Sequence, residues 1–287
     1  MLTTAELERR RQFITATDVP AILGVSPYKN ALDVWVEKTQ ALDPWGGNDA
    51  TTAGTLLEPS ILAWARTQLG PINEGDWRVH QDGILAATLD GILPNGEIVE
   101  CKSHGIVGPA NWSAWGAEGS DEIPDVYAVQ VQVQMLVTGA ARAWVPALIG
   151  GRGFVMFCVQ AHPLIHEHIL KSTTKFWDRV LDREPPDIDE TIHLETVKRM
   201  QRIAGKSVPL SDDLVAAYQR ACEIAKEADA AKKSAHEALL MSLGDAEIGV
   251  WSGGEYAYTE VKRAGYTVEP TSYRQLRARK VKEAATV

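Results

Sequence analysis

The fold is decided by the stretch Leu89-Asp90-Gly91-Ile92-Leu93-Pro94-Asn95-Gly96-Glu97-Ile98-Val99-Glu100-Cys101-Lys102. It is typical of two short strands joined by a tight turn, because Asn-Gly tolerates the positive φ that a reversal requires. Side chains of a strand alternate between its faces, so Glu100 and Lys102 should point the same way and Cys101 to the other face. Asp90, where the first strand ends, should lie across from that pair. The stretch therefore predicts two carboxylates and an ammonium at one spot.

Carboxylates that converge in this way repel each other unless a cation binds between them. A hard divalent cation held by Asp90 and Glu100, with Lys102 beside it, satisfies both carboxylates. An exposed hairpin with a surface ion pair is the other interpretation, because three residue types at loose spacing also recur by chance. The remaining sequence has to favour one or the other.

The composition indicates an ordinary globular chain. It has 287 residues, of which 45% are hydrophobic and 23% charged, enough for one large domain and an appendage. No apolar run is long enough to span a membrane, and the first residues lack the pattern of a signal peptide. The three cysteines are widely separated, which favours reduced thiols and excludes a four-cysteine iron–sulfur site. We therefore expect a cytoplasmic protein that does not contact a membrane.

The net charge of −9 argues mildly against a nucleic-acid partner, so its distribution matters. Basic residues outnumber acidic ones from 261 to 287, and Arg9-Arg10-Arg11 form a second basic group. An acidic body can bind a polyanion through such patches, because Coulomb forces act over a Debye length of ~8 Å. Solvated charge on helix surfaces is an equally good interpretation of either patch alone.

Several separated blocks, in order along residues 10–160, carry a more specific signal. The first comprises Arg10, Ile14–Asp18, Ile22–Gly24, Ser26–Tyr28 and Trp35–Thr39; later ones are Gly54–Pro59, the Asp90 to Lys102 stretch and Tyr127–Gly139. Together they resemble the YqaJ-like viral recombinases, the lambda exonuclease family within the PD-(D/E)xK nuclease superfamily. One departure is visible: Thr17 stands where serine is common in that family, and it keeps the hydroxyl.

The resemblance implies a metal-dependent site. Asp90, Glu100 and the Cys101 carbonyl would hold Mg²⁺, or Mn²⁺ as a substitute. Glu58, on a helix over Thr51–Leu69 that Pro59 opens or kinks, would be a third acidic group; a first-turn carboxylate favoured by the helix dipole is the other interpretation. Lys102 would orient the attacking water or stabilise the developing charge.

The resemblance also implies DNA contacts. Arg10 and Thr17 would hold a 5′-phosphate, which agrees with the anion-binding character expected where a helix begins after Thr17 or Asp18. Gln130 and Gln132, on a helix from Asp125 to Thr138, would help to hold the site and its DNA. Amides that bond the backbone of neighbouring strands are the alternative interpretation of these glutamines.

The expected fold class is α/β: a mixed central sheet flanked by helices, as in the PD-(D/E)xK core, over residues 1–205. Residues 206–287 would add a long helix, a β-hairpin and a basic helix over Tyr273–Lys282. The long helix carries a coiled-coil-like stripe of mostly small residues, which predicts tight pairing with the body of the chain or with another subunit. Its members are Leu214, Tyr218, Ala221, Ala225, Ala228, Ala235 and Leu239.

The function implied is an exonuclease that digests one strand of linear double-stranded DNA from the 5′ end, as a ring-shaped trimer. It would pass the exposed 3′ strand to a single-strand annealing protein, in a bacterial host and with a phage or prophage origin. An endonuclease or repair nuclease of the same superfamily would keep the metal site without a 5′-phosphate pocket. A non-catalytic DNA-binding protein is disfavoured, because binding alone does not require Asp90, Glu100 and Lys102 together.

Overall fold

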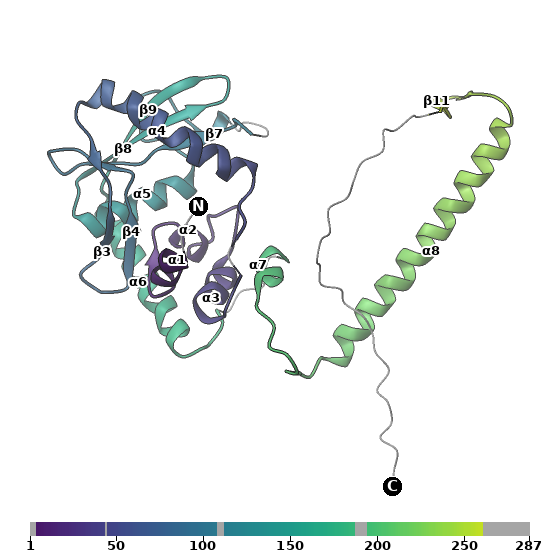
Figure 1. Ribbon diagram of the computed structural model, residues 1–287, viewed down its shortest axis with the longest axis horizontal. Helices are drawn as coiled ribbons and strands as arrows, with labels where there is room; N and C mark the ends of the chain where they lie inside the picture. Colours follow the sequence, from purple (N-terminus) through teal and green to yellow (C-terminus); the bar gives the residue numbers. More distant parts are fainter. Residues whose placement is uncertain (1–3, 44, 108–111, 187–193, 261–287) are drawn as a thin grey trace, which may run out of the picture. The chain divides into compact units, whose positions relative to one another are not determined.

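The computed structural model describes residues 4–43, 45–107, 112–186 and 194–260. The chain divides into two compact units, Met1–Ala204 and Gly205–Val287, and each is described by itself (Figure 1).

The main sheet of the first unit contains the stretch that the sequence singled out. Its strands run in the order β2-β5-β6-β8-β7, with β9 also paired to β8. The bounds are Asn73–Glu74 (β2), Gly91–Ile92 (β5), Ile98–Val99 (β6), Lys102–His104 (β7), Arg142–Ile149 (β8) and Gly153–Gln160 (β9). The antiparallel pairing of β5 with β6, through a turn in which Gly96 has a φ of +87°, confirms the predicted hairpin.

Strands β6 and β7 pair in parallel with successive parts of β8, Ile98 opposite Ala143 and Lys102 opposite Ala147. They therefore form one strand that is interrupted at Glu100 and Cys101. The backbone N–H of Glu100 still donates to the carbonyl of Trp144, at 3.0 Å, so the interruption stays attached to β8.

A smaller sheet brings the N-terminal segment to the same place. Strand β1 (Ile14–Thr15) runs parallel to β4 (Leu85–Thr88), which pairs on its other side with β3 (Trp77–Val79). Thr15 lies opposite Ala86, four residues before Asp90. The segment that follows Arg10 is thus fixed beside the chain that leads into Asp90.

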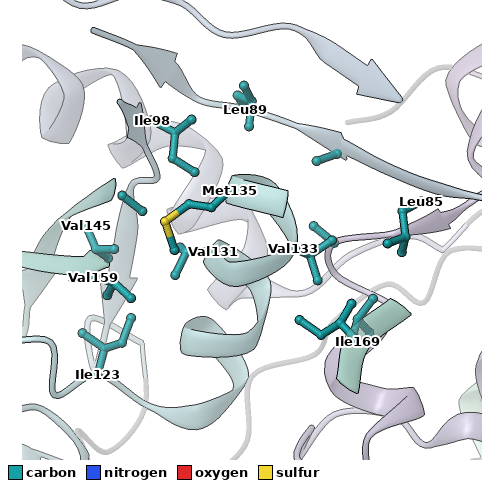
Figure 2. Packing of buried hydrophobic residues seen from close by; sticks show 14 of the residues in the cluster. Leu85, Leu89, Ile98, Ile123, Val131, Val133, Met135, Val145, Val159 and Ile169 are labelled. Carbon is teal, nitrogen blue, oxygen red and sulfur yellow. The ribbon is translucent and has the colours of Figure 1, made fainter. Parts of the chain in front are cut away.

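The helices of the first unit are α1 (Thr4–Arg11), α2 (Val19–Ile22), α3 (Ala31–Thr39), α4 (Asp49–Leu69), α5 (Asp125–Thr138), α6 (Pro163–Leu181) and α7 (Leu194–Arg199), with a 3₁₀ turn at Trp112–Ala114. Helix α4 packs on β7, β8 and β9 of the main sheet, and α5 packs on β8. The larger hydrophobic cluster surrounds α5, where Val131 and Met135 pack near Ile98 and Val145 (Figure 2). A smaller cluster lies under α4 and includes Ile61, Val99 and Cys101. This arrangement confirms the predicted mixed sheet flanked by helices.

The bounds of α4 correct one expectation about Glu58 and Pro59. The helix begins earlier than predicted, because Asn48 and Thr51 form a reciprocal capping box at its N-terminus. Pro59 lies inside the helix and does not open it, so Glu58 is a mid-helix residue, well beyond the first turn.

In the second unit, α8 (Asp212–Leu243) has no buried residue, and Leu214, Tyr218 and Leu239 of the predicted stripe are exposed. Strands β10 (Ile248–Trp251) and β11 (Gly254–Ala257) form the expected antiparallel hairpin. The predicted basic helix over 273–282 lies outside the described residues. No helix in the described part of either unit is long and apolar enough to cross a membrane.

Candidate active site

One cavity of about 400 Å³ in the first unit gathers most of the predicted site residues. Asp90, Glu100, Cys101 and Lys102 line it together with Glu58 of α4 and Gln130 of α5. Arg10 and Thr17, predicted on separate grounds to bind phosphate, line the same cavity. The remaining lining residues are Ala16, Thr51, Gly54, Ile61, Thr88, Ser103 and Tyr127. Groups that could bind a cation and groups that could bind an anion therefore share one space.

Glu100 is the most firmly held acid of the site, with 4% of its surface exposed. Its Oε1 accepts hydrogen bonds from Lys102 Nζ at 2.6 Å and from Gln130 Nε2 at 2.5 Å. Its Oε2 accepts from Gln134 Nε2 at 2.6 Å. Because a carboxylate has about four lone-pair positions, these bonds fix Glu100 and still leave it able to bind a cation.

Asp90 and Glu58 lie near Glu100, and Lys102 does not fully offset the repulsion among these carboxyl groups. Burial, and then the neighbouring carboxylate of Glu100, raise the pKa of Asp90 to about 8. The same two causes raise the pKa of Glu58. Asp90 Oδ2 accepts the backbone N–H of Cys101 at 2.8 Å, which ties the two strands of the hairpin together beside Glu100. An acidic cluster of this kind favours a cation.

Cys101 offers the cavity its backbone, since its side chain belongs to the hydrophobic cluster under α4 and burial raises the pKa of its thiol. Among the described residues, no three His, Cys, Asp or Glu side chains stand close enough to form a ready-made metal site.

The Arg10 guanidinium faces the cavity between two hydroxyls. Its Nη2 donates to Thr17 Oγ1 at 2.9 Å and lies 3.3 Å from Thr15 Oγ1. The helix that follows, α2, has only four residues and begins after Asp18, whose side chain makes no capping bond. The cationic character of this part of the cavity therefore comes from Arg10, and the helix start that the sequence suggested contributes little.

Asp18, which lies next to Thr17, supports the cavity in a way that the sequence did not predict. Its buried carboxylate accepts hydrogen bonds from Thr15 N (2.9 Å), Thr15 Oγ1 (2.7 Å), Lys29 Nζ (2.7 Å) and Lys38 Nζ (2.8 Å). Burial would raise the pKa of Asp18, but Lys29, Lys38 and Arg10 together hold it well below its usual value. Lys38 Nζ also donates to the carbonyl of Arg10, at 2.9 Å. The Asp18 network thus fixes the segment that carries Arg10 and Thr17.

The glutamines of α5 separate into two faces. Gln130 and Gln134, four residues apart and hence on one face, both reach Glu100. Gln132 points away: its amide donates to the Gln160 carbonyl at 2.8 Å and accepts from His162 N at 3.0 Å. Gln132 thus bonds neighbouring backbone, outside the cavity, while Gln134, which the sequence prediction missed, supports the site. The i, i+4 spacing from Gln130 was the available signal.

Comparison with known proteins finds similar sequences and folds. Residues 7–141 match the YqaJ-like viral recombinase domain. This segment is therefore similar to the YqaJ-like viral recombinase domain. All residues that line the cavity fall inside it. The chain is also 28% identical over 191 residues to the uncharacterized protein YqaJ of Bacillus subtilis strain 168, covering 64% of this chain. It spans 58% of the length of that relative.

Solved structures with a similar fold include an exonuclease. An alkaline exonuclease (LHK-Exo) from Laribacter hongkongensis superimposes with a TM-score of 0.50 and 18% sequence identity, over 63% of this chain and 94% of that one. The same enzyme in complex with dAMP gives the same values.

Proposed function

We propose that this protein is a magnesium-dependent exonuclease that degrades one strand of linear double-stranded DNA from the 5′ end. The observation that carries the proposal is the shared cavity, in which Arg10 and Thr17 stand with Asp90, Glu100 and Lys102. The match to the YqaJ-like domain, and a fold neighbour whose name is alkaline exonuclease, support it.

The residues present fit a divalent cation. Asp90, Glu100 and Glu58 supply carboxylate oxygens, the ligands that Mg²⁺ prefers, and burial close to Glu100 raises the pKa of Asp90 to about 8. A cation bound among these three carboxylates would offset the repulsion between them. When bound, it would polarise the phosphate and lower the pKa of the attacking water. The Cys101 carbonyl and Mn²⁺ belong to the same proposal, as a further ligand and a substitute ion.

Lys102, Arg10 and Thr17 hold the DNA and stabilise the charge that develops on its phosphate. Lys102, fixed by Glu100 and Gln130, orients the water or stabilises the charge on the phosphate oxygens. The water oxygen forms a bond to phosphorus while the P–O3′ bond breaks, so the products are a mononucleotide with a 3′-hydroxyl and a shortened strand with a new 5′-phosphate. Arg10 and Thr17 hold that 5′-phosphate, so each cleavage prepares the end for the next.

The wider setting follows from the family resemblance and is part of the proposal. The 3′ single strands would serve recombination by strand annealing, with a single-strand annealing protein as partner. The proposal also includes assembly into a ring-shaped trimer, a phage or prophage origin, and a location in the cytoplasm of a bacterial host.

The test follows the shortening of end-labelled linear duplex with and without Mg²⁺, with 5′-phosphate or 5′-hydroxyl ends. We expect Mg²⁺-dependent shortening that is faster from phosphorylated ends, because a terminal phosphate carries more charge than an internal diester and guanidinium donors favour it. Covalently closed circles should stay intact, and Glu100→Gln should abolish cleavage, because an amide oxygen is a poorer ligand for a hard cation.

Arg10→Ala should remove the preference by slowing phosphorylated substrates alone, whereas Arg11→Ala, on the same helix but outside the cavity, should keep it. Equal rates on circular and linear duplex would indicate an endonuclease with the same metal site. Absence of any cleavage in Mg²⁺ or Mn²⁺, with DNA binding intact, would indicate a non-catalytic DNA-binding protein.

A further inference from the structure

We propose that Gln134 is a positioning residue that sets the affinity of the carboxylate site for a divalent cation by holding Glu100. The proposal rests on the proposed function, in which Glu100 is a metal ligand. Gln134 itself touches neither the cation nor DNA, because it does not line the cavity and lies behind Glu100, with 1% of its surface exposed.

The contacts of Gln134 are all made by the nitrogen of its amide. Nε2 donates to Glu100 Oε2 at 2.6 Å and to the backbone carbonyl of Thr88 at 3.1 Å. Its Oε1 is buried and makes no hydrogen bond to the described residues. The reverse orientation would set Oε1 against two acceptors, so the amide orientation is determined by its surroundings. The position therefore requires a side chain with two donors.

This geometry links the two strands that carry the proposed metal ligands. Thr88 ends β4, two residues before Asp90, and Glu100 lies at the break between β6 and β7. Gln134 connects them from the side of α5, and the bond from Cys101 N to Asp90 Oδ2 connects them directly. Because Gln134 holds the carboxylate oxygen that Lys102 and Gln130 leave unbonded, its loss frees that oxygen to turn away.

Gln130 acts differently, because its Oε1 also accepts from Lys102 at 3.0 Å. Substitution of Gln130 would disturb the lysine and the carboxylate together. Gln134 makes no contact with Lys102, so a substitution there changes the holding of Glu100 and leaves the lysine in place. Metal affinity and the chemical step can thus be separated at Gln134.

The experiment compares Gln134→Met with Gln132→Met in the full-length chain. Both replacements are close in volume and remove a buried amide from the same helix, but Gln132 bonds only the backbone of Gln160 and His162. Mn²⁺ binding is measured by titration calorimetry without DNA, and thermal unfolding is measured without metal. We expect Gln134→Met to bind Mn²⁺ about 10–100-fold more weakly than wild type, the usual effect of losing a partner of a metal ligand. Gln132→Met should bind as wild type does, although both variants unfold at lower temperature.

Cleavage provides a second measurement. At saturating Mn²⁺ the rate of Gln134→Met should approach that of wild type with an unchanged KM for DNA, whereas at low Mn²⁺ it should fall with the metal affinity. If Gln134→Met does not fold, Gln134→Asn, which keeps the amide but is one methylene too short to reach Glu100, should show the same weaker binding. Equal Mn²⁺ affinity in wild type and the Gln134 variant would overturn the positioning role alone. Failure of the wild-type chain to bind Mn²⁺ would overturn the proposed function with it.

Discussion

Lys102 lies between two acceptors, with its ammonium 2.6 Å from Glu100 Oε1 and 3.0 Å from Gln130 Oε1. It also lies 4.9 Å from the centre of the Tyr127 ring. A side chain held on three sides is preorganised, so it spends little energy on reorientation when charge develops on the substrate.

Lys102→Ala should therefore cost about 2–4 kcal/mol in the chemical step, by analogy with the loss of a preorganised donor. Single-turnover cleavage in Mg²⁺ measures this, and DNA binding in Ca²⁺ should change far less. Lys171→Ala, which removes an exposed ammonium on α6, serves as the control. A parallel loss of binding and rate would make Lys102 a DNA anchor without a part in the chemistry.

Asp18 predicts a distinct dependence of stability on pH. Its pKa in the folded protein is lowered by Lys29, Lys38 and Arg10, whereas in the unfolded chain it is about 3.9. The carboxylate therefore stabilises the fold fully above that value, and the contribution is lost as the pH falls through the lower, folded-state pKa.

Asp18→Asn should destabilise the protein by roughly 3–5 kcal/mol at neutral pH, because it removes the carboxylate that the buried Lys38 and the partly exposed Lys29 share. Denaturant unfolding at several pH values should show this difference shrinking below about pH 3.9. Asp76→Asn, in an exposed pair with Arg78, should have little effect at any pH. A difference that stays constant down to pH 2.5 would contradict the assignment.

For single residues, the sequence predicted the features that depend on neighbours close in the chain. Strand alternation placed Glu100 and Lys102 on one side, and the two side chains are hydrogen bonded. It could not predict that Asp18 pairs with Lys38, because twenty residues and an intervening helix separate them. Nor could it show that Gln132 points away from the cavity, since the direction of each amide depends on how α5 packs.

Helices and strands were predicted best where the hydrophobic pattern extends over many residues. Helix α5 has the predicted bounds, and the β10–β11 hairpin forms as expected. The start of α4 was predicted less well, because it depends on a local cap: Asn48 extends α4 in the N-terminal direction. Helix α2 begins after Asp18, as predicted, and has only four residues. Helix α7 was not predicted, since its six residues are too few to show a period.

Gly75, between β2 and β3, lets the chain pass close to the backbone that precedes Asp90. A Cβ at this position would lie 1.9 Å from the carbonyl oxygen of Leu89, so the backbone before Asp90 would have to move. Gly75→Ala should destabilise the protein by about 1–3 kcal/mol and should also reduce cleavage, because Asp90 shifts relative to Glu100.

The measurement combines denaturant unfolding with the rate of duplex shortening. Gly46→Ala, where an added Cβ meets nothing within 4 Å, should change neither. A Gly75→Ala variant with the stability and rate of wild type would show that the strands can separate at Leu89 without cost, against the close packing described.

At the scale of the whole molecule, the family resemblance and the cavity coincide. The match to the YqaJ-like viral recombinase domain spans residues 7–141, and both hydrophobic clusters lie within the first unit. The second unit lies beyond that match, and its long helix has no buried residue in the described structure. The sequence could not predict what pairs with the stripe on α8, because a coiled-coil pattern in one sequence does not identify the surface that it pairs with.

The last prediction concerns the independence of the first unit. A chain that ends at Ala204 should unfold cooperatively and should still shorten a short linear duplex in Mg²⁺, because every residue that lines the cavity and both clusters that support it are retained. The same truncation with Glu100→Gln should be inactive, which excludes a contaminating nuclease. If the truncated chain folds but does not cleave, the second unit must supply DNA contacts or an assembly that cleavage requires. If it does not fold, the first unit depends on the second for stability, and the boundary at Ala204 does not separate two independently folding units.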